Sequence, residues 1–182
     1  GSGMKRLLIG LLLSALGGGV YHIGMARFGS GSPPAMAPVQ QQADLVEVSK
    51  AHRTLTLVRG GMPIARFPVA FGAAADAGPK RQEGDERTPE GQYRIDWRNA
   101  RSSYYLSLHI SYPDASDIAE ARRRGVAPGG NVMIHGLPNG WSWFGSVHHL
   151  ADWTDGCIAV TNAEMREIWA RVPDGTPIRI DP

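Results

Sequence analysis

Cysteine is almost absent from this sequence, which contains Cys157 alone among 182 residues. One cysteine cannot form a disulfide within the chain, so Cys157 stands out as a free and reactive thiol. Strong charge is also lacking, because the formal net charge of +2 is too small to predict nucleic-acid binding. There is no P-loop, no dinucleotide-type glycine fingerprint and no zinc pattern of paired cysteines. These absences argue against nucleotide-binding, nucleic-acid-binding and zinc-finger classes.

Glycine and proline are plentiful, with 23 and 13 residues, which favours a β-rich domain with many turns. Thr161 and Glu164 form a capping-box signature that predicts a helix start, and Asp114 or Ser116 can begin a short helix that ends at Gly125. We therefore expect an α+β, β-dominated fold, a β-sandwich or open barrel with one or two peripheral helices. Alternation and short apolar runs predict strands at residues 45–49, 54–59, 64–71, 91–97, 104–110, 132–134, 158–160 and 178–180.

Glycine and proline also constrain the first strands. Gly60 and Gly61 allow positive φ and predict a hairpin turn. Pro63 and Pro68 confine the strand that follows to a sheet edge or a bulge. The polar loop at residues 72–90 is long enough to predict a functional role, and we expect it to border the site.

The N-terminal segment has the pattern of a leader. Residues 1–3 are typical of a cloning scar. Lys5 and Arg6 precede a short apolar run, so residues 4–25 resemble an export signal or an uncleaved anchor, with a buried helix as the alternative. By the positive-inside rule, the rest of the chain lies outside the cytoplasm.

Two further boundaries follow from composition. Residues 26–43 are rich in Gly, Ser, Pro and Gln and predict a flexible linker. The folded domain is expected at residues 44–182.

Residues 132–162 hold the candidate chemistry. His135 ends one apolar run, and Cys157 stands immediately before another, so the two can face each other across a sheet as a base and a thiol nucleophile. One alternative is that Cys157 is a buried small hydrophobe and His135 a satisfied strand-end residue. Another is a zinc site formed by His135, His148, His149 and Cys157.

The glycines beside this pair fit the nucleophile hypothesis. Gly136 leaves space after His135. Gly156 lets the backbone turn tightly, so the N–H groups near Cys157 can form an oxyanion hole.

Three segments carry a resemblance to a known family. They are I-H-G at residues 134–136, D-W-T-D-G-C-I-A-V-T-N-A-E at 152–164 and G-P-K-R-Q-E-G-D-E-R-T-P-E-G-Q-Y at 78–93. Together they resemble the L,D-transpeptidase (YkuD-like) family over about residues 45–180. The resemblance implies a YkuD-like fold in the bacterial envelope and a cysteine that attacks a peptidoglycan stem peptide. A thioester acyl-enzyme then passes its acyl group to an amine, with no metal or organic cofactor.

Carried over by position, Cys157 is the nucleophile and His135 moves the proton, while Thr154 and Gly156 shape the turn and the oxyanion environment. Two positions depart from the usual family core. Asp155 stands where a histidine is expected, and it either orients an imidazole or caps the turn. Ala159 stands where an arginine is expected, which puts recognition of the donor in question.

The loop between these strands is rich in candidates for supporting roles. Candidates for a second shell or a substrate loop are His149, Asp152, Trp153 and Gly136, and an exposed loop is the alternative for the first three. Its aromatic residues can stack on sugars or form a local mini-core. They are Trp141, Trp143, Phe144 and Trp153.

The resemblance predicts a cross-linking enzyme of the 3-3 or 1-3 type, in the periplasm, anchored in the inner membrane or exported. Its expected partners are diaminopimelate-containing stem peptides and the inner membrane, with no nucleic acid. Two alternatives stay open from the residues alone. One is a peptidoglycan amidase or hydrolase of the same fold, which for example releases a wall-linked lipoprotein. The other is a wall-binding module without catalysis.

Overall fold

The computed structural model describes residues 31–141 and 154–182, together with Met4 and residues 14–15, 17–21 and 23–25. Much of the predicted leader and part of the central loop therefore lie outside the described residues. In the part of the chain that is described, no helix combines the length and the apolar character needed to cross a membrane.

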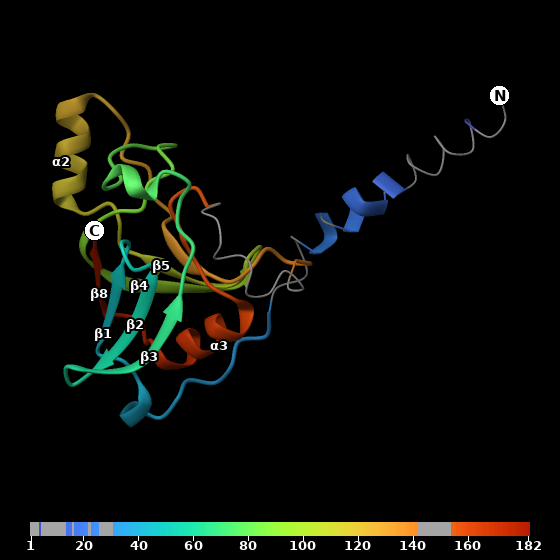
Figure 1. Cartoon of the computed structure of the whole chain (residues 1–182), viewed down its shortest axis with the longest axis horizontal. Helices are drawn as coiled ribbons and strands as arrows, with labels where there is room; N and C mark the ends of the chain where they lie inside the picture. Colours follow the sequence, from blue (N-terminus) through green and yellow to red (C-terminus); the bar gives the residue numbers. More distant parts are fainter. Residues whose placement is uncertain (1–3, 5–13, 16, 22, 26–30, 142–153) are drawn as a thin grey trace.

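Eight strands of the described domain form one mixed sheet in the order β3-β2-β1-β8-β4-β5-β6-β7. Figure 1 shows β1, β2 and β3 side by side in this sheet. Two α-helices accompany the sheet, so the expected α+β, β-dominated class is confirmed. The elements are β1 (Leu45–Ser49), β2 (Thr54–Arg59), β3 (Met62–Pro68), β4 (Gly91–Ser102), β5 (Tyr105–Ile110), α2 (Ala115–Arg124), β6 (Met133–His135), β7 (Ile158–Ala159), α3 (Asn162–Arg171) and β8 (Pro177–Asp181), with short 3-10 turns at Val39–Gln41 and Ala75–Ala77.

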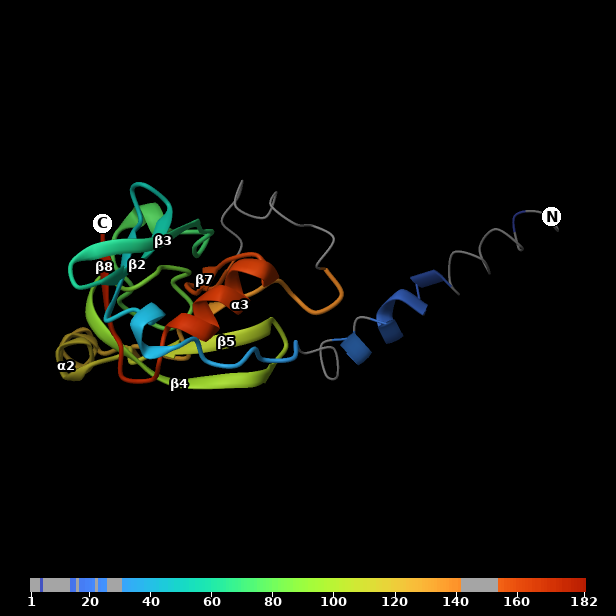
Figure 2. The ribbon, with the colours of Figure 1, turned by 90° about the horizontal axis from the view of Figure 1, so that it is seen from below.

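β4 joins the two halves of the sheet. Its first residues pair with β8, and the rest pairs with β5 through two register shifts. Such bulges bend a strand and increase its twist. In Figure 2, β2 and β3 lie on one side of α3, and β4 and β5 lie on the other. The sheet therefore curves around a core that α3 closes.

α3 packs its predicted apolar stripe into this core. Thr161 Oγ1 accepts from the Glu164 N–H at 3.3 Å, and the Glu164 carboxylate accepts from the Thr161 N–H at 2.8 Å, which confirms the capping box. The helix buries Met165, Ile168 and Trp169. The strands meet them with large side chains that are at most 1% exposed, including Leu55, Leu57, Ile95, Leu106, Leu108, Ile110, Ile134 and Ile158.

The local glycine and proline signals are also confirmed. Gly60 and Gly61 have φ of 55° and 76° in the β2–β3 hairpin. β3 contains Pro63 and Pro68 and lies at the sheet edge, where a missing N–H costs no ladder bond. Asp114 caps α2 by accepting from two backbone N–H groups.

The segment before the domain is hydrogen-bonded to it from Gly31 onward. Gly31 N–H donates to Tyr105 O at 3.1 Å, and Ala37 N–H donates to Ala170 O at 2.8 Å. Ala43 N–H donates to Arg171 O at 2.8 Å. This part of the expected linker therefore runs along α3.

Candidate active site

β6 and β7 bring His135 and Cys157 to one face of the sheet. The strands are parallel, with Ile134 opposite Ile158. Cys157 comes one residue before Ile158 and lies beside Met133, whose N–H donates to Sγ at 3.4 Å. Because side chains alternate along a strand, Met133, His135 and Cys157 share the face opposite the two buried isoleucines.

A cavity of about 410 Å³ opens on this face. His135 and Cys157 both line it, so the structure brings the predicted pair into one site. The surrounding groups are mostly small and polar, as expected for a site that binds amides. The other lining residues are Asn99, Ser102, Ser103, Tyr104, Ser107, Gly130, Asn131, Met133, Thr154 and Asp155.

The His135 ring is held in one tautomer. It is 4% exposed, and Nδ1 lies 2.7 Å from Gly136 O. A carbonyl oxygen only accepts, so Nδ1 carries the proton and Nε2 is the basic nitrogen. The Tyr104 ring packs against the imidazole with 4.6 Å between ring centroids. Both contacts restrict the orientation of the His135 ring.

Gly136 is required by packing rather than by open space. A Cβ at this position would lie 2.6 Å from Asn162 Oδ1 and 3.0 Å from Tyr105 Cβ. Asn162 Oδ1 also accepts from the Leu137 N–H at 2.8 Å. The space that the sequence predicted beside His135 is therefore filled by the first residue of α3.

Thr154 and Gly156 form the turn that presents Cys157. Thr154 Oγ1 donates to Cys157 O at 2.7 Å and accepts from the Gly156 N–H at 3.3 Å. Gly156 has φ of 109°, and a Cβ there would lie 2.3 Å from Arg87 O. The bonds that close the turn therefore come from Thr154, while Asp155 is exposed at the cavity wall. The oxyanion role of this turn stays a prediction.

The loop at residues 72–90 borders the turn, as expected. Ala73 N–H donates to Thr154 O at 3.2 Å. A Cβ on Gly72 would lie 2.1 Å from Glu86 O and 2.8 Å from Gly156 Cα. The absence of a side chain at Gly72 and Gly156 thus lets the loop and the turn before Cys157 approach each other closely.

A buried ion pair braces the same loop. Lys80 Nζ lies 3.0 Å from Asp85 Oδ1, and both side chains are at most 10% exposed. The Asp85 carboxylate also accepts from the N–H groups of Arg81, Gln82 and Arg87. Burial raises the Asp85 pKa, but the hydrogen bonds outweigh burial and hold the pKa below its ordinary value.

The environment of Cys157 favours the neutral thiol. Burial raises its pKa most, and the charge of Asp155 raises it further, against the lowering effects of the Met133 N–H and Lys80. The pKa is raised overall, so the thiol is protonated at neutral pH. Its sulfur lies 3.7 Å from Asn131 O, toward which the S–H donates. A base is therefore needed to generate the nucleophile.

Several predicted residues lie outside the described part of the chain. They are His148, His149, Asp152 and Trp153, together with Trp143 and Phe144. Trp141 is described and is 39% exposed. The supporting roles proposed for the loop stay predictions.

The turn between β4 and β5 supplies Ser103 and Tyr104, two cavity residues that the sequence did not predict, and Asn139 from the segment after β6 holds this turn. Asn139 is 6% exposed; its Nδ2 donates to Ser102 O at 3.0 Å, and its Oδ1 accepts from the Tyr105 N–H at 2.9 Å. These bonds hold the turn that carries Tyr104 over His135. The only sequence signal was Ser102 and Ser103 between two strands, which marks a turn but not its partner.

Comparison with known proteins identifies the family to which this domain belongs. Residues 43–180 match the YkuD family, the L,D-transpeptidase catalytic domain. The chain belongs to this family. YafK of Escherichia coli (strain K12), assigned to the L,D-transpeptidases, is 32% identical over 95 residues, which cover 50% of this chain and 30% of YafK. The chain therefore spans less than a third of that relative.

Solved structures share the L,D-transpeptidase fold. The helical cell shape determining protein Pgp2 from Campylobacter jejuni has a TM-score of 0.56 and 24% identity, covering 75% of this chain and 46% of Pgp2. Bd1075 from Bdellovibrio bacteriovorus has a TM-score of 0.53 and 24% identity, covering 82% and 51%. An L,D-transpeptidase from Mycobacterium smegmatis has a TM-score of 0.50 and 15% identity, covering 76% and 58%.

Ala159 occupies the position of the expected family arginine. Its side chain is fully buried, and its backbone exchanges hydrogen bonds of 2.8 Å and 3.0 Å with Ala70. Position 159 therefore contributes no side-chain charge to the site. The positive charge that acts on the Cys157 thiol comes from Lys80.

Proposed function

We propose that this protein is a cysteine L,D-transpeptidase that cross-links peptidoglycan stem peptides in 3-3 or 1-3 register. One observation carries the proposal. The single cysteine and a buried imidazole with a fixed tautomer line one cavity of a YkuD domain, where β6 ends at His135 and the neighbouring β7 begins just after Cys157. A neutral thiol beside a base is the arrangement that nucleophilic acyl transfer requires.

In the first half-reaction, the Cys157 S–H turns from Asn131 O to His135 Nε2 and transfers its proton there. The sulfur attacks the carbonyl carbon of the stem residue with an L-centre. The C–N bond to the next, D-configured residue then breaks. His135 returns the proton to the leaving amine, and a thioester remains on Cys157.

In the second half-reaction, the side-chain amine of a diaminopimelate residue attacks the thioester carbonyl. His135 Nε2 accepts a proton from this amine. The C–S bond breaks, the new amide forms, and the sulfur regains its proton from His135. The cross-link forms without a change in oxidation state and without another reactant.

We infer that the reaction takes place in the periplasm. Lys5, Arg6 and the apolar run after them support export or anchoring in the inner membrane. A role in cell shape is part of the proposal, since Pgp2 is a cell-shape-determining protein of similar fold.

Muropeptide analysis tests the reaction. Wild type, Cys157→Ala and His135→Gln are expressed in cells, and the digested wall is analysed by mass spectrometry. We expect cross-linked dimers with wild type and their loss with either variant. His52→Gln is the matched control, because His52 is exposed, is bonded to Ser49 Oγ at 2.9 Å and does not line the cavity.

The same measurement separates the rival functions. Linked peptides that disappear with wild type but persist with Cys157→Ala would identify a hydrolase. An unchanged profile, with wall binding retained by Cys157→Ala, would identify a binding module. Either result rejects cross-linking as the function.

A further inference from the structure

A row of side chains links Cys157 to an exposed tryptophan on the same sheet face. Trp97 of β4 lies opposite His109 of β5, and His109 lies opposite Met133 of β6. Met133 lies beside Cys157, the residue immediately before β7. Cross-strand neighbours share a face, so the row crosses four strands, or about 14 Å at a spacing of about 4.8 Å.

Trp97 is presented as a flat surface. Its ring stacks on the His109 imidazole with 4.8 Å between centroids and an angle of 18°. Trp97 is nevertheless 41% exposed, so part of its ring surface remains accessible to a ligand. The Trp97 ring therefore packs on His109 at the protein surface and is not buried in the core.

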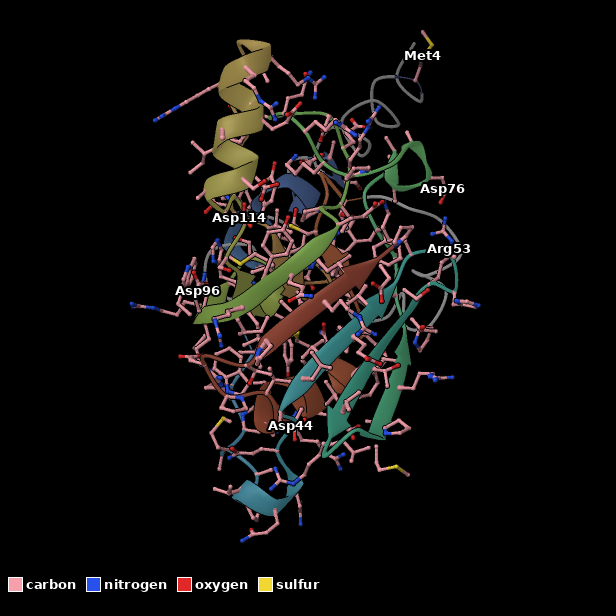
Figure 3. The ribbon with its side chains drawn as sticks, turned by 90° about the vertical axis from the view of Figure 1, so that its left-hand side faces the viewer. Met4, Asp44, Arg53, Asp76, Asp96 and Asp114 are labelled. Carbon is pink, nitrogen blue, oxygen red and sulfur yellow. The ribbon has the colours of Figure 1, made fainter. Side chains whose placement is uncertain are left out.

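A bulge in β4 adds a carboxylate to this surface. The β4–β5 register shifts between Ile95 and Trp97, so Asp96 is the extra residue. Asp96 Oδ1 lies 2.6 Å from His109 Nδ1, and the Asp96 side chain, labelled in Figure 3, is 43% exposed. Bulges re-aim side chains and are over-represented beside active sites. We call Asp96, Trp97 and His109 the Trp97 platform.

The platform continues into the cavity. Asn99 follows Trp97 by two residues on β4, and Ser107 precedes His109 by two residues on β5. Both line the cavity that contains His135 and Cys157. Residues two apart on a strand share a face, so cavity and platform form one surface.

We propose that the Trp97 platform binds an amino sugar of the glycan strand whose stem peptide lies in the cavity. The inference rests on the proposed function and extends it to the donor. A tryptophan face accepts the apolar face of a pyranose ring, and a carboxylate at its edge accepts hydrogen bonds from hydroxyl groups.

The span from Cys157 fits this assignment. For a 3-3 cross-link the attacked carbonyl belongs to the third stem residue, and three extended residues reach about 10–11 Å. The linker from the peptide to its sugar covers the remaining few ångströms to Trp97. A peptide occupying the platform instead is an outcome of the test.

Binding measured without turnover tests the platform. In the full chain carrying Cys157→Ala, isothermal titration calorimetry gives the Kd of a disaccharide-tetrapeptide and of the same tetrapeptide without sugar. We expect Trp97→Ala to weaken disaccharide-tetrapeptide binding about tenfold, as for the loss of roughly 50 Å² of apolar contact. Binding of the free tetrapeptide should not change, and Trp97→Phe should retain most of the affinity.

Trp141→Ala is the matched control, since Trp141 is similarly exposed at 39% but is not part of the row. Equal weakening of both ligands by Trp97→Ala, or of neither, overturns the proposal. So does a sugar-dependent loss in Trp141→Ala. Because the measurement needs no turnover, sugar-dependent binding without cross-linked products in cells would reject the reaction and keep the platform.

Discussion

Replacing Gly156 with alanine tests whether the turn before Cys157 positions the sulfur. Gly156 has φ of 109°, and the new Cβ would lie 2.3 Å from Arg87 O. The backbone strain costs about 1–2 kcal/mol. Restoring ordinary contact also requires the turn or the neighbouring loop to move by about 1 Å, a displacement that can cost about 100-fold in rate.

Gly175→Ala separates the effect of backbone strain from the effect of a steric contact. Gly175 has φ of 91°, but a Cβ there meets nothing within 4 Å. Both variants should lower the unfolding temperature, by about 4 °C per kcal/mol. Only Gly156→Ala should also slow cross-linking by about 100-fold. Equal unfolding temperatures and equal, near-wild-type rates in the two variants would show that the turn does not position the thiol.

Three further substitutions test the electrostatics and support of the site. Asp155→Asn should lower the Cys157 pKa, because the Asp155 charge raises it, and should move the pH profile of alkylation by iodoacetamide to lower pH; an unmoved profile contradicts this. Lys80→Met should move the profile to higher pH and, by leaving Asp85 charged and unpaired, destabilise the fold by about 3–5 kcal/mol in denaturant unfolding. Asn139→Ala should lower the free energy of unfolding by about 1–3 kcal/mol in the same measurement, because it leaves the Tyr105 N–H and Ser102 O buried without a hydrogen-bond partner. A smaller loss would mean that water takes the place of the Asn139 amide.

Much of the fold could be predicted because its signals are local. Gly60 and Gly61 specify the β2–β3 turn, and Pro63 and Pro68 restrict β3 to the edge of the sheet. β4 was predicted too short, because it continues to Ser102. Asparagine, alanine and arginine at residues 99–101 have little strand preference, so pairing with β5 rather than propensity extends this strand.

The site was predictable only where chemistry and strand ends coincide. His135 and Cys157 each adjoin an apolar run, and their residue types indicate base and nucleophile. Nothing in the local sequence identifies Lys80 or Tyr104 as site residues, because the packing of segments that are distant in sequence brings them near His135 and Cys157. The requirement for glycine at position 156 likewise depends on Arg87 O, which no local pattern reveals.

The replacement of the expected arginine by Ala159 changes how a donor can be recognised. Among the described residues, no lysine or arginine lines the cavity, and Asp155 is its one carboxylate. Lys80 is paired with Asp85 and therefore tunes the thiol rather than contacting a substrate carboxylate. Within the described part of the chain, the groups left to recognise a donor are the neutral hydrogen-bonding residues of the cavity and contacts farther along the row. The Trp97 platform supplies such a contact about 14 Å from the sulfur. We therefore expect donor selection to depend in part on the sugar end of the substrate, where the exposed Trp97 lies.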